Sequence, residues 1–151
     1  NYQIKDPMLD AAVYRFYMQL FNKSKANMIM DPNIAYLYFD FFVHSGKAVR
    51  EVQKVLNREG FDLLEDNKMG WNTLNAINSH PEPARLHDEI KKQRENYLRQ
   101  VAKIGDNSKF LPGWLNRIAS FPDLYPGATA GLLIATAAGV AGYLIFKTIQ
   151  I

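Results

Sequence analysis

Asp40 is the carboxylate of this sequence whose neighbours set it apart. It lies between Tyr38-Phe39 and Phe41-Phe42-Val43 in an almost wholly apolar segment, where an ionised group needs a partner or a cleft open to water. His44 follows four residues later on the same helical face and is a candidate partner. Two interpretations stay open for Asp40: a hydrogen bond between helices, or a place beside a substrate cleft. For His44 the alternative is an ordinary histidine near a helix end.

A second set of candidate residues lies in and just after a segment rich in turn residues. Asp66-Asn67-Lys68 is typical of a turn, and Asp66 is also a candidate substrate contact. Trp71 and Trp114 carry flat apolar rings that suit the apolar faces of sugars. Anchoring a hydrophobic core is the alternative role for Trp114, and it is the favoured one.

Composition excludes several classes of chemistry. Cysteine is absent, which rules out disulfides, thiolate metal sites and a cysteine nucleophile. The three histidines, at 44, 80 and 87, are too scattered for a recognisable metal site, and no glycine-rich phosphate loop occurs. We therefore expect neither a metal nor a cofactor. The formal net charge of +3 is mild and the basic residues are interleaved with acidic ones, so nucleic acid is not an expected partner.

These residues must be positioned by helices, because apolar side chains recur at helical spacing over residues 1–120 and no alternating strand pattern occurs. Asp6-Pro7 and Asp31-Pro32 each offer an N-cap followed by proline at the first helical position. Gly60 can close the third helix as a left-handed cap. The expected helices cover residues 8–21, 32–43, 49–56, 71–77, 84–103 and 111–120. The sequence therefore predicts an all-α domain over residues 1–120.

The C-terminal residues predict a membrane anchor. No charged side chain occurs between Leu124 and Phe146, which is long enough for the roughly 20 residues that a bilayer core requires. Tyr125 and Tyr143 near its ends and Lys147 after it suit the two headgroup layers. We therefore expect a linker at 121–123, a transmembrane helix at 124–147 and the lipid bilayer as a partner. The alternative is a fully buried helix of the core.

Small residues recur every fourth position in this expected span. Gly127, Gly131, Ala135 and Gly139 would present a face with almost no side-chain bulk, which favours association with another membrane helix. The alternative is that glycine and alanine are simply common in membrane helices.

Three pieces of sequence, taken together and in order, carry a family resemblance. They are Ile34–Gly46, then Gln53 with Asp66, Gly70 and Thr73–Asn78, then Phe110–Arg117. They resemble the C-terminal half of the phage and bacterial muramidases of glycoside hydrolase family 108. The resemblance implies a compact lysozyme-like helical domain, a peptidoglycan-binding region, and peptidoglycan glycan strands as a partner. With the anchor, it implies a single-pass protein of the bacterial inner membrane or of the internal membrane of a phage virion.

Departures from the family pattern leave the activity open. The family's general acid lies in a Glu-Gly-Gly turn, which this sequence lacks; Asp66-Asn67 stands for the usual Asp-Gly, and Trp71 for a common proline. Glycosidases need a carboxylic acid at the leaving oxygen. Glu59 before Gly60 is the nearest equivalent, yet it stands at a helix end where solvated glutamate is ordinary. No catalytic residue is assigned.

Two functions follow as hypotheses. The first is a membrane-anchored, muramidase-like peptidoglycan hydrolase component whose acid lies upstream of Asn1, so that the chain alone is inactive. The second is a non-catalytic relative that binds peptidoglycan or serves as a structural membrane protein, for example in a virion.

Overall fold

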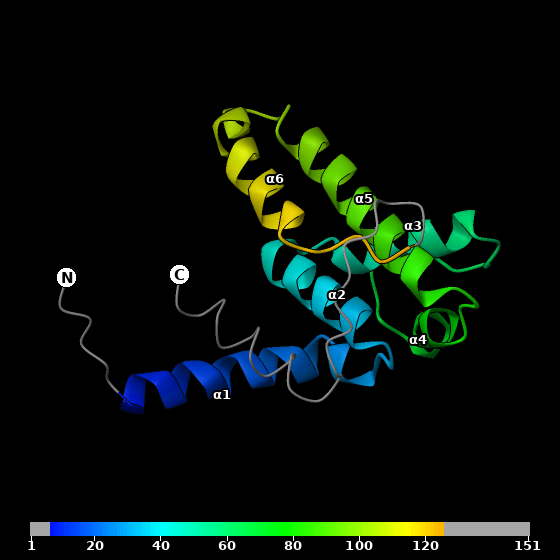
Figure 1. Cartoon of the computed structure of the whole chain (residues 1–151), viewed down its shortest axis with the longest axis horizontal. Coiled ribbons are helices and arrows are strands. Elements are labelled where there is room, and N and C mark those ends of the chain that lie inside the picture. The colour runs from blue at the N-terminus through cyan, green and yellow to red at the C-terminus, as the bar shows by residue number, and fades with distance from the viewer. Residues whose placement is uncertain (1–6, 126–151) are drawn as a thin grey trace.

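The computed structural model describes residues 7–125, and in this range the predicted all-helical class is confirmed (Figure 1). No strand occurs among these residues. Each expected helix is found close to its predicted position. The elements are α1 (Pro7–Lys23), η1 (Ala26–Met28), α2 (Pro32–His44), α3 (Ala48–Arg58), α4 (Trp71–Asn78), α5 (Pro83–Val101), η2 (Asn107–Phe110) and α6 (Leu111–Ala119).

Helix α2 is the centre of the core. Its first turn is capped by the Asp31 carboxylate, which accepts hydrogen bonds from the backbone N–H groups of Asn33 and Ile34 at 2.9 and 3.0 Å. Leu37, Tyr38 and Phe41 in the body of the helix are completely buried, with 0% of each residue exposed. In Figure 1, α2 (cyan) lies between α1 and the pair formed by α5 and α6.

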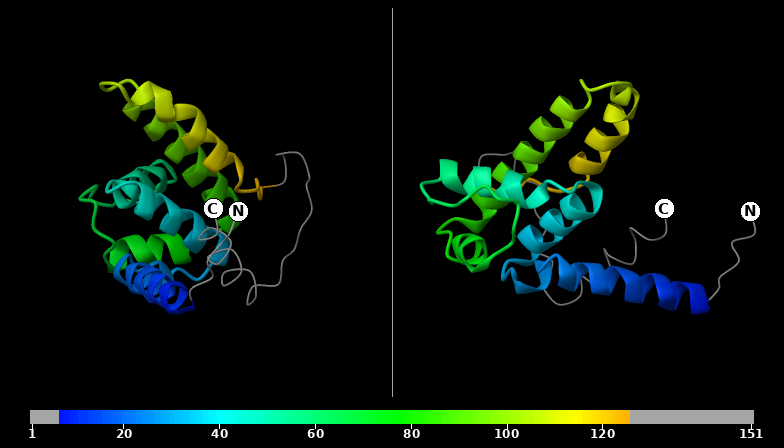
Figure 2. Two further views of the ribbon diagram at one scale, coloured as in Figure 1. Left: turned by 90° about the vertical axis from the view of Figure 1, so that its left-hand side faces the viewer. Right: turned by 180° about the vertical axis from the view of Figure 1, so that it is seen from behind.

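Helices α3, α5 and α6 complete the domain around α2. The buried face of α3 carries Val52, Val55 and Leu56, and α5 packs against α2, α3 and α6. Figure 2 shows α6 alongside α5 in both views, while α1 extends past the other helices and leaves Tyr14 and Phe16 exposed.

The chain after α6 runs along α5. Phe121 is buried, and its carbonyl oxygen accepts a hydrogen bond of 2.6 Å from the Lys91 ammonium group. The Asp88 carboxylate accepts hydrogen bonds from the backbone N–H groups of Leu124 and Tyr125 at 2.9 to 3.0 Å. Residues 121–125 are therefore held by specific contacts to α5.

The expected transmembrane helix is corrected by the structure. Within residues 7–125, no helix combines the length and the apolar character that crossing a membrane requires. The longest of them, α5, has 19 residues, but charged side chains such as Arg85, Glu89 and Lys92 recur along it and are costly in hydrocarbon. The predicted fold, a lysozyme-like domain followed by a membrane helix, is wrong in its membrane part.

The predicted localisation is corrected by the same finding. A single-pass anchor in the bacterial inner membrane or a virion's internal membrane has no supporting helix among the described residues, and lipid is not supported as a partner. Beyond Tyr125, the expected span lies outside the described residues. So does the small-residue row Gly127, Gly131, Ala135 and Gly139.

Candidate functional site

The Asp40 carboxylate joins three helices. Arg94 on α5 donates to its Oδ2 atom from Nη2 at 2.6 Å. Arg117 on α6 donates from Nε to both carboxylate oxygens at 3.0 Å and from Nη2 to Oδ1. Asp40 is therefore the hydrogen-bonded hub of α2, α5 and α6, which is the structural one of its two interpretations.

Burial and charge oppose each other in this cluster. Burial would raise the pKa of the Asp40 carboxyl, but the hydrogen bonds and positive charges of Arg117 and Arg94 outweigh burial and hold the pKa below its ordinary value. The Arg94 side chain is 0% exposed, and its guanidinium carbon lies 5.4 Å from the ring centre of Phe41 and 5.7 Å from that of Phe121. Asp40 is thus a charged acceptor with no proton to give at neutral pH.

His44 lies beside this cluster without bonding to it. Its Nδ1 atom is buried and has no hydrogen-bond partner among the described residues. Its ring meets the edge of Trp114 at a centroid distance of 5.7 Å. Burial, followed by the charges of Arg94 and Arg117, lowers the pKa of His44, so the imidazole is neutral at pH 7. The candidate pairing of Asp40 with His44 is not found, because Arg94 and Arg117 are the partners of the carboxylate.

A polar row on α3 holds the loop of residues 61–70. Arg50, Gln53 and Asn57 are spaced by three and four residues, so they lie on one helix face, and we call them the α3 polar row. Arg50 donates from Nε to the Glu65 carbonyl oxygen at 2.9 Å. Asn57 accepts from the Leu63 N–H at 2.8 Å and donates to the Leu63 carbonyl at 2.9 Å.

Gln53 is the central residue of the α3 polar row and is 1% exposed. Its Nε2 group donates to the Asp66 carboxylate at 3.0 Å, and to the Lys68 carbonyl and the Thr73 hydroxyl at 3.2 Å each. Its Oε1 atom accepts from the Asn67 N–H at 3.1 Å. One buried amide thus ties the loop to the first turn of α4.

Asp66 and Asn67 form the tight turn within this loop. The side-chain hydrogen bond from Gln53 and the backbone hydrogen bond from Lys68 lower the pKa of Asp66. Asn67 has a φ of 63°, a left-handed conformation that asparagine tolerates better than most residues. Its side chain also donates to the Gly46 carbonyl at 2.7 Å. Asp66 therefore shapes the turn instead of standing free.

Trp71 follows this loop as the first residue of α4, and it is 70% exposed. Its neighbours in the chain are anchored, because Met69 and Thr73 are buried. Trp114 differs from Trp71, since it is half-buried between the His44 ring and the ring of Phe110, which is stacked on it at 6.0 Å.

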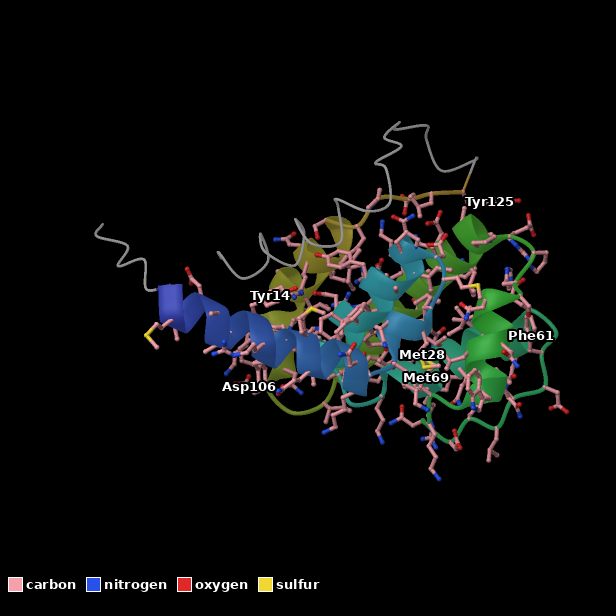
Figure 3. All side chains as sticks on the ribbon, turned by 90° about the horizontal axis from the view of Figure 1, so that it is seen from below. Tyr14, Met28, Phe61, Met69, Asp106 and Tyr125 are labelled. Carbon is pink, nitrogen blue, oxygen red and sulfur yellow. The ribbon has the colours of Figure 1, made fainter. Side chains whose placement is uncertain are left out.

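The predicted site residues fall into two groups. Asp40 and His44 lie in the charge cluster between α2, α5 and α6, whereas Asp66 and Trp71 lie in the loop and at the start of α4. No hydrogen bond or ion pair joins the two groups within residues 7–125. In Figure 3, Phe61 at the start of the loop and Asp106 in the corner before α6 lie on opposite sides of the molecule. Among the same residues, no cluster of three potential metal ligands is found.

From the sequence, no role was given to Arg94, which holds Asp40, or to the α3 polar row, which holds the loop. Arg94 occupies the row Leu86, Ile90, Arg94 and Leu98, in which all four residues are buried. A lone arginine in an apolar row of period four is a signal that Arg94 is buried and needs an acidic partner, but the row does not identify that partner. The even spacing of the α3 polar row, directly before a turn-rich segment, is the corresponding signal for the loop.

Comparison with known proteins bears on the same region. Residues 47–119 match the family model described as Predicted Peptidoglycan domain. This match supports a peptidoglycan-binding region in the chain. This region runs from the N-cap of α3 to the end of α6 and covers a little under half of the 151 residues. It supports peptidoglycan as a partner, as the resemblance implied, but it does not show glycoside hydrolase family 108. No curated protein and no solved structure matches the chain.

Gln53→Ala is predicted to loosen the loop of residues 61–70 without unfolding the helices. The substitution leaves the Asn67 N–H without its acceptor, and a lost buried hydrogen bond costs about 1–3 kcal/mol. Hydrogen exchange measured by NMR should become faster at Asn67 and around it, while α2 and α5 keep their protection. Gln100→Ala, at an exposed position of α5, is the matched control. Unchanged exchange at Asn67 would show that Gln53 does not hold the loop.

Asp40→Asn is predicted to lower stability at neutral pH and to flatten its dependence on acid. The folded-state pKa of Asp40 lies below the unfolded value of about 4, so its stabilising contribution is present above that pH and is lost as pH falls through the folded pKa. Removing the charge strands Arg94 and should cost about 3–5 kcal/mol at pH 7. Urea unfolding at pH 7, 5 and 3 measures both effects. Asp106→Asn, which alters a carboxylate that is 85% exposed, is the control. If the stability of Asp40→Asn depends on pH as strongly as that of the wild type, Asp40 is not the charged partner of the two arginines.

Proposed function

We propose that this chain binds peptidoglycan, and that the loop of residues 61–70 with Trp71 forms its glycan contact. The observation that carries the proposal is an indole ring left 70% exposed on a tightly held frame inside the matched region. Sugar rings have apolar faces that stack on aromatic side chains, and tryptophan offers the largest such surface.

The frame explains why an exposed ring here is suited to binding. The loop backbone is held by the α3 polar row, and Gly70 as N-cap of α4 accepts a hydrogen bond of 3.0 Å from the Leu74 N–H. A ligand that stacks on Trp71 therefore orders one side chain and not a whole loop. Because binding energy is what remains after such ordering costs, a preformed contact binds more tightly than a mobile one.

The three candidate carboxylates, Asp40, Asp66 and Glu59, favour binding over hydrolysis. A general acid must keep its proton near neutral pH, which requires a raised pKa, whereas the pKa values of Asp40 and Asp66 are lowered. Glu59, beside Gly60, is held by Arg85 at 2.5 Å and lies 3.9 Å from the His80 ring. Asp40 and Asp66 are therefore held in their charged form, and Glu59 is engaged in an ion pair with Arg85.

A component of a muramidase-like cell-wall hydrolase is the second candidate function. The resemblance of Ile34–Gly46 and Phe110–Arg117 to phage and bacterial muramidases supports it. In that case the described residues hold the glycan strand, and the acid comes from a residue outside them. Both candidates require the glycan contact, and they differ in whether a bond is cleaved.

Trp71→Ala is predicted to weaken binding to purified, insoluble peptidoglycan about tenfold, which corresponds to about 1.4 kcal/mol of lost stacking. Co-sedimentation with cell-wall sacculi gives the affinity, and thermal melting checks the fold, which should be unchanged because the ring is exposed. Trp71→Phe should retain part of the binding. Tyr14→Ala is the control, since it removes an exposed aromatic ring outside the matched region. Equal affinities for Trp71→Ala and Tyr14→Ala would refute the stacking site.

The chain is also predicted not to cleave peptidoglycan. Purified cell walls incubated with it should lose no turbidity and release no new reducing ends, measured beside a commercial lysozyme. Glu59→Gln and Asp40→Asn should then change nothing in this assay. Clear turnover that is abolished by either substitution, in a variant that thermal melting shows to be folded, would identify that carboxylate as the acid and favour the hydrolase.

A further inference from the structure

The Asp40 cluster contains more positive than negative groups. One carboxylate is shared by two guanidinium groups, those of Arg94 and Arg117. The pKa values of Asp40, Arg94 and Arg117 are shifted by the charges of these same three residues, and tyrosines nearby add a smaller effect on the two arginines. The neighbouring His44 is neutral at pH 7, since burial lowers its pKa. The cluster therefore has a net charge of about +1 at neutral pH.

The excess charge is accessible on Arg117. Arg94 is fully buried, whereas the Arg117 side chain is 44% exposed. Arg117 uses Nε–H and one Nη2–H for Asp40. No hydrogen bond from its Nη1 group is found within residues 7–125, so the Nη1–H groups and the second Nη2–H are available to an anion. The inner edge of the guanidinium is thus fixed by a buried carboxylate, and its outer edge can meet an anion from solvent.

Aromatic rings flank this arginine on the same helix face. Phe110, Trp114 and Arg117 are spaced by four and three residues, so they follow one another along η2 and α6. Phe110 is 50% exposed. His44, whose ring contacts Trp114, and Arg94, which shares Asp40 with Arg117, have buried atoms without hydrogen-bond partners in the described structure: Nδ1 of His44, and Nε and Nη1 of Arg94. The surface thus combines a fixed cation with apolar rings and with polar groups that lack partners.

We propose that Arg117 binds a carboxylate of the peptide stems of peptidoglycan. This inference rests on the proposed function and adds a second contact, distinct from the glycan contact at Trp71. The glycan backbone of peptidoglycan is substituted with short peptides that end in free carboxylates, and a guanidinium pairs with a carboxylate through two parallel hydrogen bonds. Because Asp40 already fixes the arginine, little side-chain entropy is lost on binding.

Arg117→Gln is the variant that tests this subsite. It leaves Arg94 and Asp40 as a balanced pair, so the domain should stay folded, as thermal melting will verify. Arg99→Gln is the matched control, because it removes the same charge from an exposed arginine of α5 that pairs with Glu95 at 2.7 Å. Arg117→Lys keeps the charge but loses the planar fork, and should bind less well than the wild type.

Two wall fractions separate the stem from the glycan: intact sacculi, and sacculi from which an amidase has removed the peptide stems. Arg117→Gln should lose about tenfold in affinity for intact sacculi and nothing for the stem-free glycan, and the loss should shrink as salt is raised. Trp71→Ala should lose affinity for both. An Arg117→Gln variant that binds intact sacculi as well as Arg99→Gln does, or that loses equally on both fractions, overturns the proposal.

A direct titration keeps the proposal testable if the variant fails to fold. Synthetic stem peptide is added to the wild-type chain, and the Arg117 Nε–H resonance is followed by NMR. Peptide with free carboxyl groups should shift this resonance, and peptide with amidated carboxyl groups should leave it unmoved. Equal shifts, or no shift with either peptide, overturn the carboxylate site. A wild-type chain that binds neither wall fraction contradicts the proposed function, and the titration still decides on Arg117.

Discussion

Asp40 brings a charge into the most apolar helix of residues 7–125, and the packing of three helices follows from that constraint. A carboxylate 6% exposed must find positive partners, and both arginines come from helices distant in sequence. The ion pair of Arg94 with Asp40 joins α5 to α2, and the ion pair of Arg117 with the same carboxylate joins α6 to α2. The two arginines differ in exposure because α5 is an inner helix and α6 an outer one: Arg94 is buried, and Arg117 is partly exposed. The same ion pairs therefore fix the core and present a cation at the surface.

The loop of residues 61–70 poses a second problem, because its backbone forms no ladder that would satisfy its polar groups. The α3 polar row supplies those partners from side chains. At Asn67 the chain takes a left-handed turn, where the muramidases that this sequence resembles usually have glycine. Asparagine tolerates that backbone and adds what glycine lacks: its side chain accepts from the Arg50 N–H at 3.0 Å and donates to the Gly46 carbonyl. The departure from the family pattern at this position therefore preserves the turn.

N-caps and apolar periodicity made the helices predictable, but they did not show which residues of distant helices pair with one another. Asp31-Pro32 and the apolar periodicity predicted α2 correctly because an N-cap and a buried face are encoded within one segment. Asp40 was recognised as needing a partner, yet Arg94 lies 54 residues away and Arg117 lies 77 residues away, and periodicity within one helix carries no information on such pairs. The membrane anchor is predicted from an uncharged segment and the residues at its ends, and within residues 7–125 no helix supports it.

Two modest contacts on one rigid frame suit a polymer better than one deep cleft would. Peptidoglycan repeats the same disaccharide and stem, so a chain that holds the glycan at Trp71 keeps many stem carboxylates within reach of other surfaces. The second contact then forms at a high effective concentration, and the combined affinity exceeds that of either contact alone. This gain depends on a fixed geometry between the sites. The α3 polar row fixes one site and the Asp40 ion pairs fix the other, and both rest on α3 and α5, which pack directly against each other. Loosening either set of buried polar contacts would therefore weaken binding to the polymer more than binding to a single sugar or a single stem.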